Sequence, residues 1–193
     1  MLRIVGGEYS SRRINTLPGG EQTRPTADRV RENIFNILQT SVPNSHVLDL
    51  FSGTGAMGIE ALSRGAKHCD FVEQNKDAAK LIQSNLDLLK VPPDRYRIFQ
   101  SDASQFLQLG KETRYCVDRF YDLVFADPPY QSVWYAKALQ EVFGSELCSK
   151  NCILCIEMDR YTELIGQEHE SWFRLTRKKY GKTCLEIWTN SKD

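Results

Sequence analysis

Short apolar runs alternate with stretches of helical periodicity along most of this 193-residue chain. Five runs have the length and the polar boundaries of strands: residues 46–51, 68–73, 96–100, 121–126 and 152–157. Apolar residues at helical spacing precede or separate these runs: residues 26–42, 58–63, 76–89 and 134–147. Thr26 follows Pro25 and is expected to cap the first helix. Strands that alternate with helices in this way predict right-handed crossovers, a largely parallel sheet and therefore an α/β fold.

The two ends of the chain break this alternation. Two pairs of short strands are predicted there, an N-terminal hairpin or arm and a hairpin at one edge of the sheet: residues 2–5 with 14–17, and 172–176 with 183–189. No repeat or linker interrupts the pattern. We therefore expect one domain over residues 1–193, with an N-terminal extension over residues 1–25 and a core over residues 26–193.

Composition narrows the class of protein only a little. The chain is 41% hydrophobic and 26% charged, its mean hydropathy is −0.44, and its apolar runs are much shorter than a bilayer span. The first residues lack the apolar segment of a signal peptide, so we expect a cytoplasmic protein with no membrane partner. The six cysteines are then expected to be reduced thiols rather than a disulfide framework.

Positive charge gathers near both ends although the formal net charge is zero. The residues that could contact nucleic-acid phosphates lie in two groups: Arg12, Arg13, Arg24 and Arg29 in the first, and Lys178, Lys179 and Lys182 in the second. An ordinary solvated face is the alternative interpretation of either group.

A glycine-rich segment follows the first core strand. Residues 53–58 read Gly-Thr-Gly-Ala-Met-Gly, a G-x-G-x-x-G pattern that is typical of dinucleotide-binding turns. Asp49 lies at the end of the preceding strand, four residues before Gly53. A carboxylate there opposes a pyrophosphate, whereas it suits the sulfonium and ammonium of S-adenosylmethionine. The pattern therefore favours S-adenosylmethionine over NAD.

Two further acids follow the next strands. Glu73 ends the second strand, where a carboxylate can accept hydrogen bonds from the ribose hydroxyls of either cofactor. Asp102 follows the third strand and could accept from the adenine amino group. Each alone could be a solvated carboxylate, but together they favour an adenosine site.

The sequence Asp127-Pro128-Pro129-Tyr130 follows the fourth strand and carries the sharpest chemical signal. The prolines fix the turn and remove two amide donors, which leaves the Pro128 carbonyl as an acceptor. The Asp127 carboxylate and that carbonyl could bind the hydrogens of an exocyclic amine, so that its lone pair points at a methyl group. Tyr130 could stack on the target base. This motif predicts an amino-group methyltransferase.

Metal and thiol chemistry are not expected. Cys152 and Cys155 form a C-x-x-C, but residues three apart in a strand face opposite sides and cannot easily share a metal. His46, His68 and His169 are scattered, and no cysteine occurs in the Asp127–Tyr130 motif for covalent attack on a pyrimidine carbon.

Taken together, the motifs resemble the RsmD-type 16S ribosomal RNA guanine-N2 methyltransferases. The resemblance runs nearly end to end and is carried by these segments: residues 3–7, 23–26, 29–32 with Phe35, 47–58, 60–66, 71–73, 127–130 and 180–183. It implies a Rossmann-like class I methyltransferase fold, with helices on both faces of a seven-stranded sheet whose last strand is antiparallel. It also implies an N-terminal extension that contacts RNA, and methyl transfer to N2 of one guanine. Ser11, Ser52 and Ala126 depart from the family pattern without removing a functional group.

By this resemblance, each part of the cofactor has its own contacts. Asp49, Gly53 and Gly55 would contact the methionine end, Glu73 the ribose, and Asp102 with Ala103 the adenine; Phe51 belongs to the same site. Residues 127–130 would hold the flipped guanine. Thr26 joins the arginines and lysines named above as an expected RNA contact.

Two other functions stay open at this point, because the Asp-Pro-Pro-Tyr motif is shared with other amino methyltransferases. One is an adenine-N6 DNA methyltransferase, and the other is a noncatalytic RNA-binding assembly factor. The motif defines the reaction, whereas the N-terminal arm carries the assignment of 16S rRNA or the assembled small subunit as partner.

Overall fold

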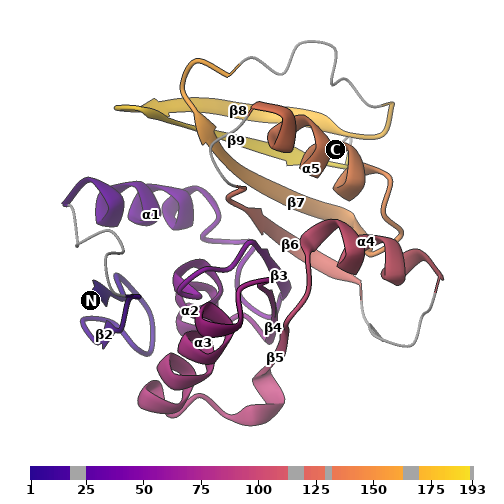
Figure 1. Cartoon of the computed structure of the whole chain (residues 1–193). Helices are drawn as coiled ribbons and strands as arrows, with labels where there is room; N and C mark the ends of the chain where they lie inside the picture. Colours follow the sequence, from indigo (N-terminus) through magenta and orange to yellow (C-terminus); the bar gives the residue numbers. More distant parts are fainter. Residues whose placement is uncertain (18–24, 113–119, 129–131, 163–169, 192–193) are drawn as a thin grey trace.

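The computed structural model describes residues 1–17, 25–112, 120–128, 132–162 and 170–191. Seven strands form one twisted sheet in the order β5-β4-β3-β6-β7-β9-β8 (Figure 1). Their bounds are β3 His46–Leu50, β4 His68–Val72, β5 Tyr96–Phe99, β6 Tyr121–Ala126, β7 Cys148–Asp159, β8 Phe173–Tyr180 and β9 Thr183–Thr189. β3 to β7 run parallel, and β9 pairs antiparallel with both β7 and β8. This arrangement confirms the predicted α/β fold with an antiparallel last strand.

Helices cover both faces of the sheet, as predicted. They are α1 Pro25–Ile37, α2 Ala56–Ser63, α3 Lys76–Leu89, α4 Ala103–Glu112 and α5 Ser132–Phe143, with a short 3-10 turn η1 at Pro93–Arg95. Successive side chains of strand β6 point to opposite faces of the sheet and so enter two different hydrophobic cores. Leu123 and Phe125 pack in the cluster of α1, α2 and α3, whereas Val124 and Ala126 pack with α4 and α5. Among the described residues, no helix is long and apolar enough to cross a membrane.

Several element boundaries differ from the sequence-based expectation. Helix α1 begins at Pro25, so Thr26 lies inside the first turn and its predicted role as N-cap is wrong. Proline is well suited to a first helical turn because it has no amide hydrogen to leave unpaired. Strand β7 begins at Cys148 rather than at residue 152, since its early residues reach the start of β6 across a register shift.

The C-terminal hairpin is tighter than predicted. Strand β8 continues to Tyr180, which pairs with Thr183 across a two-residue turn. Gly181 has a φ of +57° in that turn, a conformation that glycine adopts without strain. The second half of β8 was not predicted because it contains the charged residues Arg177, Lys178 and Lys179. A strand at the sheet edge can carry such residues and needs no alternating apolar pattern.

Candidate active site

The glycine-rich segment forms a sharp turn between β3 and α2. Phe51, Gly53 and Gly55 all have positive φ, at 60°, 54° and 77°. Gly55 N donates to the Ser52 carbonyl at 2.7 Å, and Ser52 Oγ donates to the Asp49 carbonyl at 2.6 Å, which closes the turn. Gly58 serves packing instead, because a Cβ there would overlap the Phe71 ring. The first two glycines therefore shape the turn, and the third lets α2 approach β4.

Asp49 lies beneath this turn and is only 3% exposed. Its Oδ2 accepts a hydrogen bond from Gly58 N at 2.9 Å. Burial raises the pKa of Asp49 to about 8; the Gly58 hydrogen bond opposes this rise and the negative charge of Glu73 adds to it. A nearby cation would favour the ionised carboxylate, so the electrostatic preference expected from the sequence is retained. The contact of Asp49 with the methionine end stays a prediction.

Glu73 ties the glycine-rich turn to the end of β4. Its Oε2 accepts from Gly53 N at 2.8 Å and its Oε1 accepts from Asn75 N at 2.7 Å. The Asn75 side chain caps α3 by accepting from Asp77 N and Ala78 N. A carboxylate has about four acceptor positions, so Glu73 retains capacity for hydroxyl donors after these two bonds.

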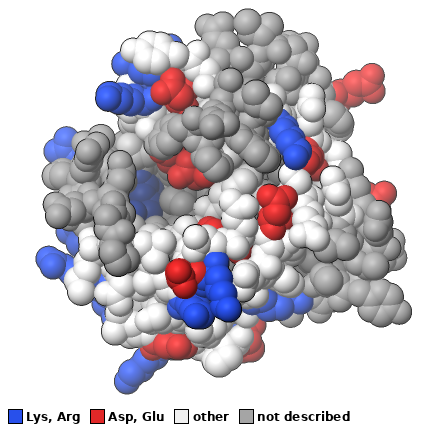
Figure 2. Space-filling view, in the orientation of Figure 1, with Lys and Arg blue, Asp and Glu red and all other residues white. Residues whose placement is uncertain are grey.

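A pocket of about 200 Å³ opens at the carboxyl ends of the strands. It is lined by Phe51, Val72, Glu73, Gln74, Ser101, Asp102, Ala103 and Asp127. The fold thus brings four predicted cofactor contacts together with the predicted catalytic Asp127, which confirms that strand ends far apart in the sequence meet at one place. Figure 2 shows a hollow left of centre on this face, with both acidic and basic side chains in its visible wall.

Three lining residues were not anticipated. Val72, Gln74 and Ser101 directly flank predicted acids, so the strand-end rule that selected those acids could have included them. Besides lining the pocket, Asp102 stabilises the first turn of α4, because its Oδ1 accepts a hydrogen bond from Gln105 N at 3.1 Å. Asp49, Gly53 and Gly55 do not line the pocket, although Gly53 is bonded to Glu73, which does.

The structure describes the first two residues of the predicted catalytic motif Asp127–Tyr130. Asp127 is exposed at the end of β6 and lines the pocket, and Pro128 is buried. Pro129 and Tyr130 lie outside the described residues. The hydrogen-bonding role of Asp127 and Pro128 and the stacking role of Tyr130 therefore stay predictions.

The donor set around the pocket fits S-adenosylmethionine. The charged side chains among the described residues that line the cavity are Glu73, Asp102 and Asp127, and all three are carboxylates. Carboxylates would oppose a pyrophosphate at short range but accept from hydroxyl and amino groups and attract a sulfonium. Glu73 and Asp102 would hold the nucleoside part.

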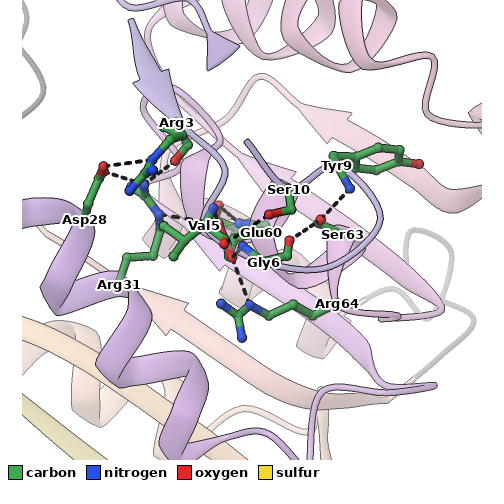
Figure 3. Close-up of polar contacts among 12 residues, drawn as sticks. Arg3, Val5, Gly6, Tyr9, Ser10, Asp28, Arg31, Glu60, Ser63 and Arg64 are labelled. Carbon is green, nitrogen blue, oxygen red and sulfur yellow. Dashed lines mark hydrogen bonds and ion pairs between the residues drawn. The ribbon is translucent and has the colours of Figure 1, made fainter. Parts of the chain in front are cut away.

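The N-terminal segment is fastened to the core rather than standing apart as a free arm. Its short hairpin of β1 (Leu2–Arg3) and β2 (Arg13–Ile14) lies beside α2 and α3 (Figure 1). Figure 3 shows Glu60 of α2, which is fully buried, at the centre of the junction. Its carboxylate accepts from Val5 N, Gly6 N and Arg64 Nε, each at 2.8 Å, and lies 3.6 Å from Arg31 Nε of α1.

Buried Asn85 of α3 links this segment to the glycine-rich turn. Its Oδ1 accepts from Asn15 N at 2.8 Å, and its Nδ2 donates to the carbonyls of Asn15 at 3.2 Å and Thr54 at 3.1 Å. One side chain thus holds the end of the N-terminal hairpin and the cofactor turn together. Nothing local in the sequence marks Asn85 for this role.

The residues predicted to contact RNA differ in their exposure and in the hydrogen bonds that they already make. Arg12 donates to the carbonyls of Leu88 and Leu89 at 2.6 and 3.0 Å, so its guanidinium also closes the end of α3. Arg13 and Arg29 are exposed, the side chain of Thr26 is not described, and Arg24 lies outside the described residues.

The C-terminal cations divide into two groups. Arg174 and Arg177 of β8 both pair with buried Glu186 at 3.1 Å. Lys178, Lys179 and Lys182 are exposed, and no carboxylate within the described ranges forms an ion pair with them. The three lysines are therefore cations of this hairpin that a phosphate could reach without breaking one of these ion pairs.

The two cysteines of the C-x-x-C lie in different cores of the protein. In the part of the chain that the structure describes, no three potential ligands cluster as a metal site would require. Cys152 packs in the core on the α4 and α5 side and Cys155 in the core on the opposite face, as the strand geometry predicted.

A relative named as a methyltransferase, 30% identical over 98% of this chain, gives the class of this protein: it is a methyltransferase, and its acidic strand-end pocket fits the cofactor S-adenosylmethionine. A solved methyltransferase-fold structure complexed with SAH, the demethylated form of that cofactor, has a TM-score of 0.70 at 16% identity and covers 86% of this chain and 50% of that one, a likeness of fold alone. The chain belongs to the family described as Conserved hypothetical protein 95, whose sequence profile matches residues 2–189.

Two similar proteins cover nearly the whole chain. Ribosomal RNA small subunit methyltransferase D of Haemophilus influenzae is 30% identical over 189 residues, which span 98% of this chain and 94% of that protein. The solved structure of the Escherichia coli protein yhhF has a TM-score of 0.84 at 24% identity and covers 100% of this chain and 99% of that one. The likeness therefore includes the N-terminal segment as well as the sheet.

Proposed function

We propose that this protein methylates the exocyclic N2 amine of one guanine in 16S rRNA of the small ribosomal subunit. The observation that carries the proposal is the position of Asp127, which lines the same pocket as Glu73 and Asp102. The amine acceptor and the nucleoside-binding acids would thus face one another across a single cavity. The name of the Haemophilus influenzae relative supports ribosomal RNA as the substrate class.

The chemistry asked of the protein is mainly positioning. An exocyclic amine is a poor nucleophile because its lone pair is delocalised into the ring. Acceptance of its two hydrogens by the Asp127 carboxylate and the Pro128 carbonyl would favour a pyramidal nitrogen with its lone pair directed along the line of attack. Tyr130 would stack on the flipped base and hold it in place. S-adenosylmethionine, when bound, supplies the methyl group on a positively charged sulfur.

The binding surface for RNA would extend from the N-terminal segment across the active-site face to the C-terminal hairpin. Arg13 and Arg29 are exposed in the N-terminal part of the chain, and Lys178, Lys179 and Lys182 are exposed on the C-terminal hairpin. Zero net charge means that these local groups supply the attraction to phosphate. We expect the assembled small subunit to be a better substrate than naked RNA and the reaction to take place in the cytoplasm.

A methyl-transfer assay tests the substrate. Small subunits that lack the modification, naked 16S rRNA and duplex DNA are each incubated with enzyme and tritiated S-adenosylmethionine, and the product is digested to nucleosides. We expect N2-methylguanosine from the ribosomal substrates. N6-methyladenine from duplex DNA would support a DNA methyltransferase instead, and a lack of transfer to every substrate in single turnover would support a noncatalytic assembly factor.

Substitution of Asp127 tests its role in catalysis. Asp127→Ala should lower kcat about 10²–10³-fold, because one acceptor aimed at the reacting amine is lost. Calorimetry should show cofactor affinity within about threefold of wild type, since Glu73 and Asp102 are intact. Asp127→Asn keeps one acceptor oxygen and should retain more activity than alanine. Loss of cofactor binding with normal turnover of saturated enzyme would reverse these assignments.

A further inference from the structure

An exposed tyrosine lies in a hydrogen-bonded turn just beyond the active-site edge of the sheet. Tyr161 is 80% exposed, more than any other large apolar side chain among the described residues. Its backbone N donates to Asp159 Oδ1 at 2.8 Å, and Thr162 N donates to the Asp159 carbonyl at 3.0 Å. Arg177 also donates to the Thr162 carbonyl at 2.5 Å. Three hydrogen bonds therefore hold the backbone of this turn, and the ring that it carries faces water.

Arg160 connects this turn to the C-terminal hairpin and stands over the ring. Its backbone N donates to the Lys182 carbonyl and its NH1 donates to the Gly181 carbonyl, both at 2.9 Å. The guanidinium carbon lies 5.4 Å from the centre of the Tyr161 ring, a cation–π distance. Arg160 thus joins the Tyr161 turn to the hairpin that carries the three exposed lysines. We call the residues of these two adjoining turns the Tyr161 platform: Arg160, Tyr161, Lys178, Lys179 and Lys182.

The topology places this platform beside the approach to the pocket. Ala126, next to Asp127, pairs with Ile156 of the parallel strand β7, and β7 continues three residues further to Asp159. At about 3.3 Å per strand residue, the turn projects roughly 10 Å past the end of the β6 pairing. Figure 2 shows Lys and Arg side chains, with one acidic side chain beside them, at the upper left, where Figure 1 draws the β8–β9 turn.

An unpaired RNA base is the occupant that this surface fits. Single-stranded nucleic acids are bound by aromatic rings that stack on bases and by cations that follow the backbone, and both are present here. A flipped target base also leaves neighbouring nucleotides unstacked, which creates a need for such a support. We propose that Tyr161 stacks on an unpaired base next to the target nucleotide, while Lys178, Lys179 and Lys182 contact its phosphates. This proposal rests on the proposed RNA substrate.

Substitutions at Tyr161 separate stacking from other effects. Tyr161→Ala should raise the Kd for a fluorescent single-stranded RNA of about 12 nucleotides, and the KM for unmodified small subunits, about 5–20-fold. Tyr161→Phe and Tyr161→Trp keep a stacking face and should stay within about twofold of wild type. Tyr161→Leu keeps apolar bulk without the ring face and should be as weak as alanine. The KM for S-adenosylmethionine should not change.

A matched control and the salt dependence sharpen the test. Phe120 is 61% exposed at the opposite end of β6, so Phe120→Ala should leave both RNA measurements unchanged. Tyr161→Ala should also keep the wild-type slope of log Kd against log salt, because a stacked ring releases no counterions.

Three results would contradict the proposal that Tyr161 stacks on an RNA base. The first is an alanine variant within twofold of wild type in both assays, and the second is full rescue by leucine. The third is a loss of affinity for assembled subunits only, which would assign the surface to a ribosomal protein. Binding of the RNA oligonucleotide needs no turnover, so failure of the proposed methylation would be seen separately in the wild-type enzyme.

Discussion

Replacement of Glu60 by alanine should release the N-terminal segment from α2 and lower the free energy of unfolding by about 3–5 kcal/mol. The carboxylate is fully buried and accepts three hydrogen bonds of 2.8 Å, from Val5 N, Gly6 N and Arg64 Nε. Hydrogen bonds to a charged group contribute about 1.5–3 kcal/mol each, so three would sum to more than is expected here. The sum is reduced because Val5, Gly6 and Arg64 are partly accessible to water in the variant.

The remaining cost comes from Arg31. Its guanidinium is buried and lies 3.6 Å from Glu60; within the described ranges it keeps Asp28 at 2.8 Å and the Arg3 carbonyl as partners in the variant. A buried charge that loses a partner is costly, which places the expected loss in the range measured for broken buried pairs. Glu60→Gln keeps the volume and one acceptor oxygen of the side chain. Its amide NH2 group would face an N–H donor in place of the second acceptor oxygen, so the free energy of unfolding should fall by about 2 kcal/mol.

Urea denaturation followed by circular dichroism measures these changes, and hydrogen exchange locates them. The amides of Ile4 and Ser11 bond to carbonyls within the segment and should lose protection before the sheet does. Glu8→Gln is the control: Glu8 is 63% exposed in its ion pair with Arg95, so its loss should cost less than about 0.5 kcal/mol. If Glu60→Ala unfolds within 1 kcal/mol of wild type, roughly the value of a single ordinary hydrogen bond, the junction in Figure 3 does not hold the segment.

Three further perturbations test the site. Because burial raises the pKa of Asp49 to about 8 while an unfolded aspartate titrates near 3.8, the folded state retains a proton that the unfolded state releases, so the urea midpoint should fall as pH rises from about 4 to about 8. Asp49→Asn should flatten this fall, and an unchanged slope would contradict the pKa assignment. Asn85→Ala removes the bond to the Thr54 carbonyl and should raise the cofactor Kd by calorimetry about 5–20-fold, whereas Gln83→Ala, at an exposed position of the same helix, should not. A triple change of Lys178, Lys179 and Lys182 to glutamine should reduce the salt slope of RNA binding by roughly 2, while Lys150→Gln, exposed at the other end of β7, should leave it unchanged; equal slopes would assign these lysines to a solvated face.

The sequence predicted the bounds of a helix or strand correctly where the residues that stabilise it lie close together in the chain. The helix predicted over residues 76–89 and the strand predicted over residues 121–126 have those bounds in the structure. For the helix, the apolar spacing and the cap at Asn75 lie within one stretch of chain. Boundaries failed where a distant partner decides them, as at Cys148, whose place in β7 depends on its pairing with Tyr121.

The candidate site follows the same division. Alternation of strands and helices implies a parallel sheet, and the carboxyl ends of parallel strands share one edge, so Glu73, Asp102 and Asp127 could be expected together from the sequence. The burial of Asp49 beneath the turn could not, because it depends on the approach of α2 at Gly58. Its raised pKa follows from that burial.

The sequence by itself determined the fold class and the acidic character of the strand ends, since periodicity and residue type are properties of short stretches. It also carries the prediction for the chemistry of the Asp127 motif. Only the tertiary structure decided which polar groups are structural. Glu60 reads in the sequence as an ordinary helical acid, yet it fixes residues more than fifty positions away, and Asn85 joins Asn15 to Thr54. Arg174 and Arg177 are committed to Glu186 whereas the neighbouring lysines are not. Such roles depend on burial and on partners distant in sequence, which packing alone sets.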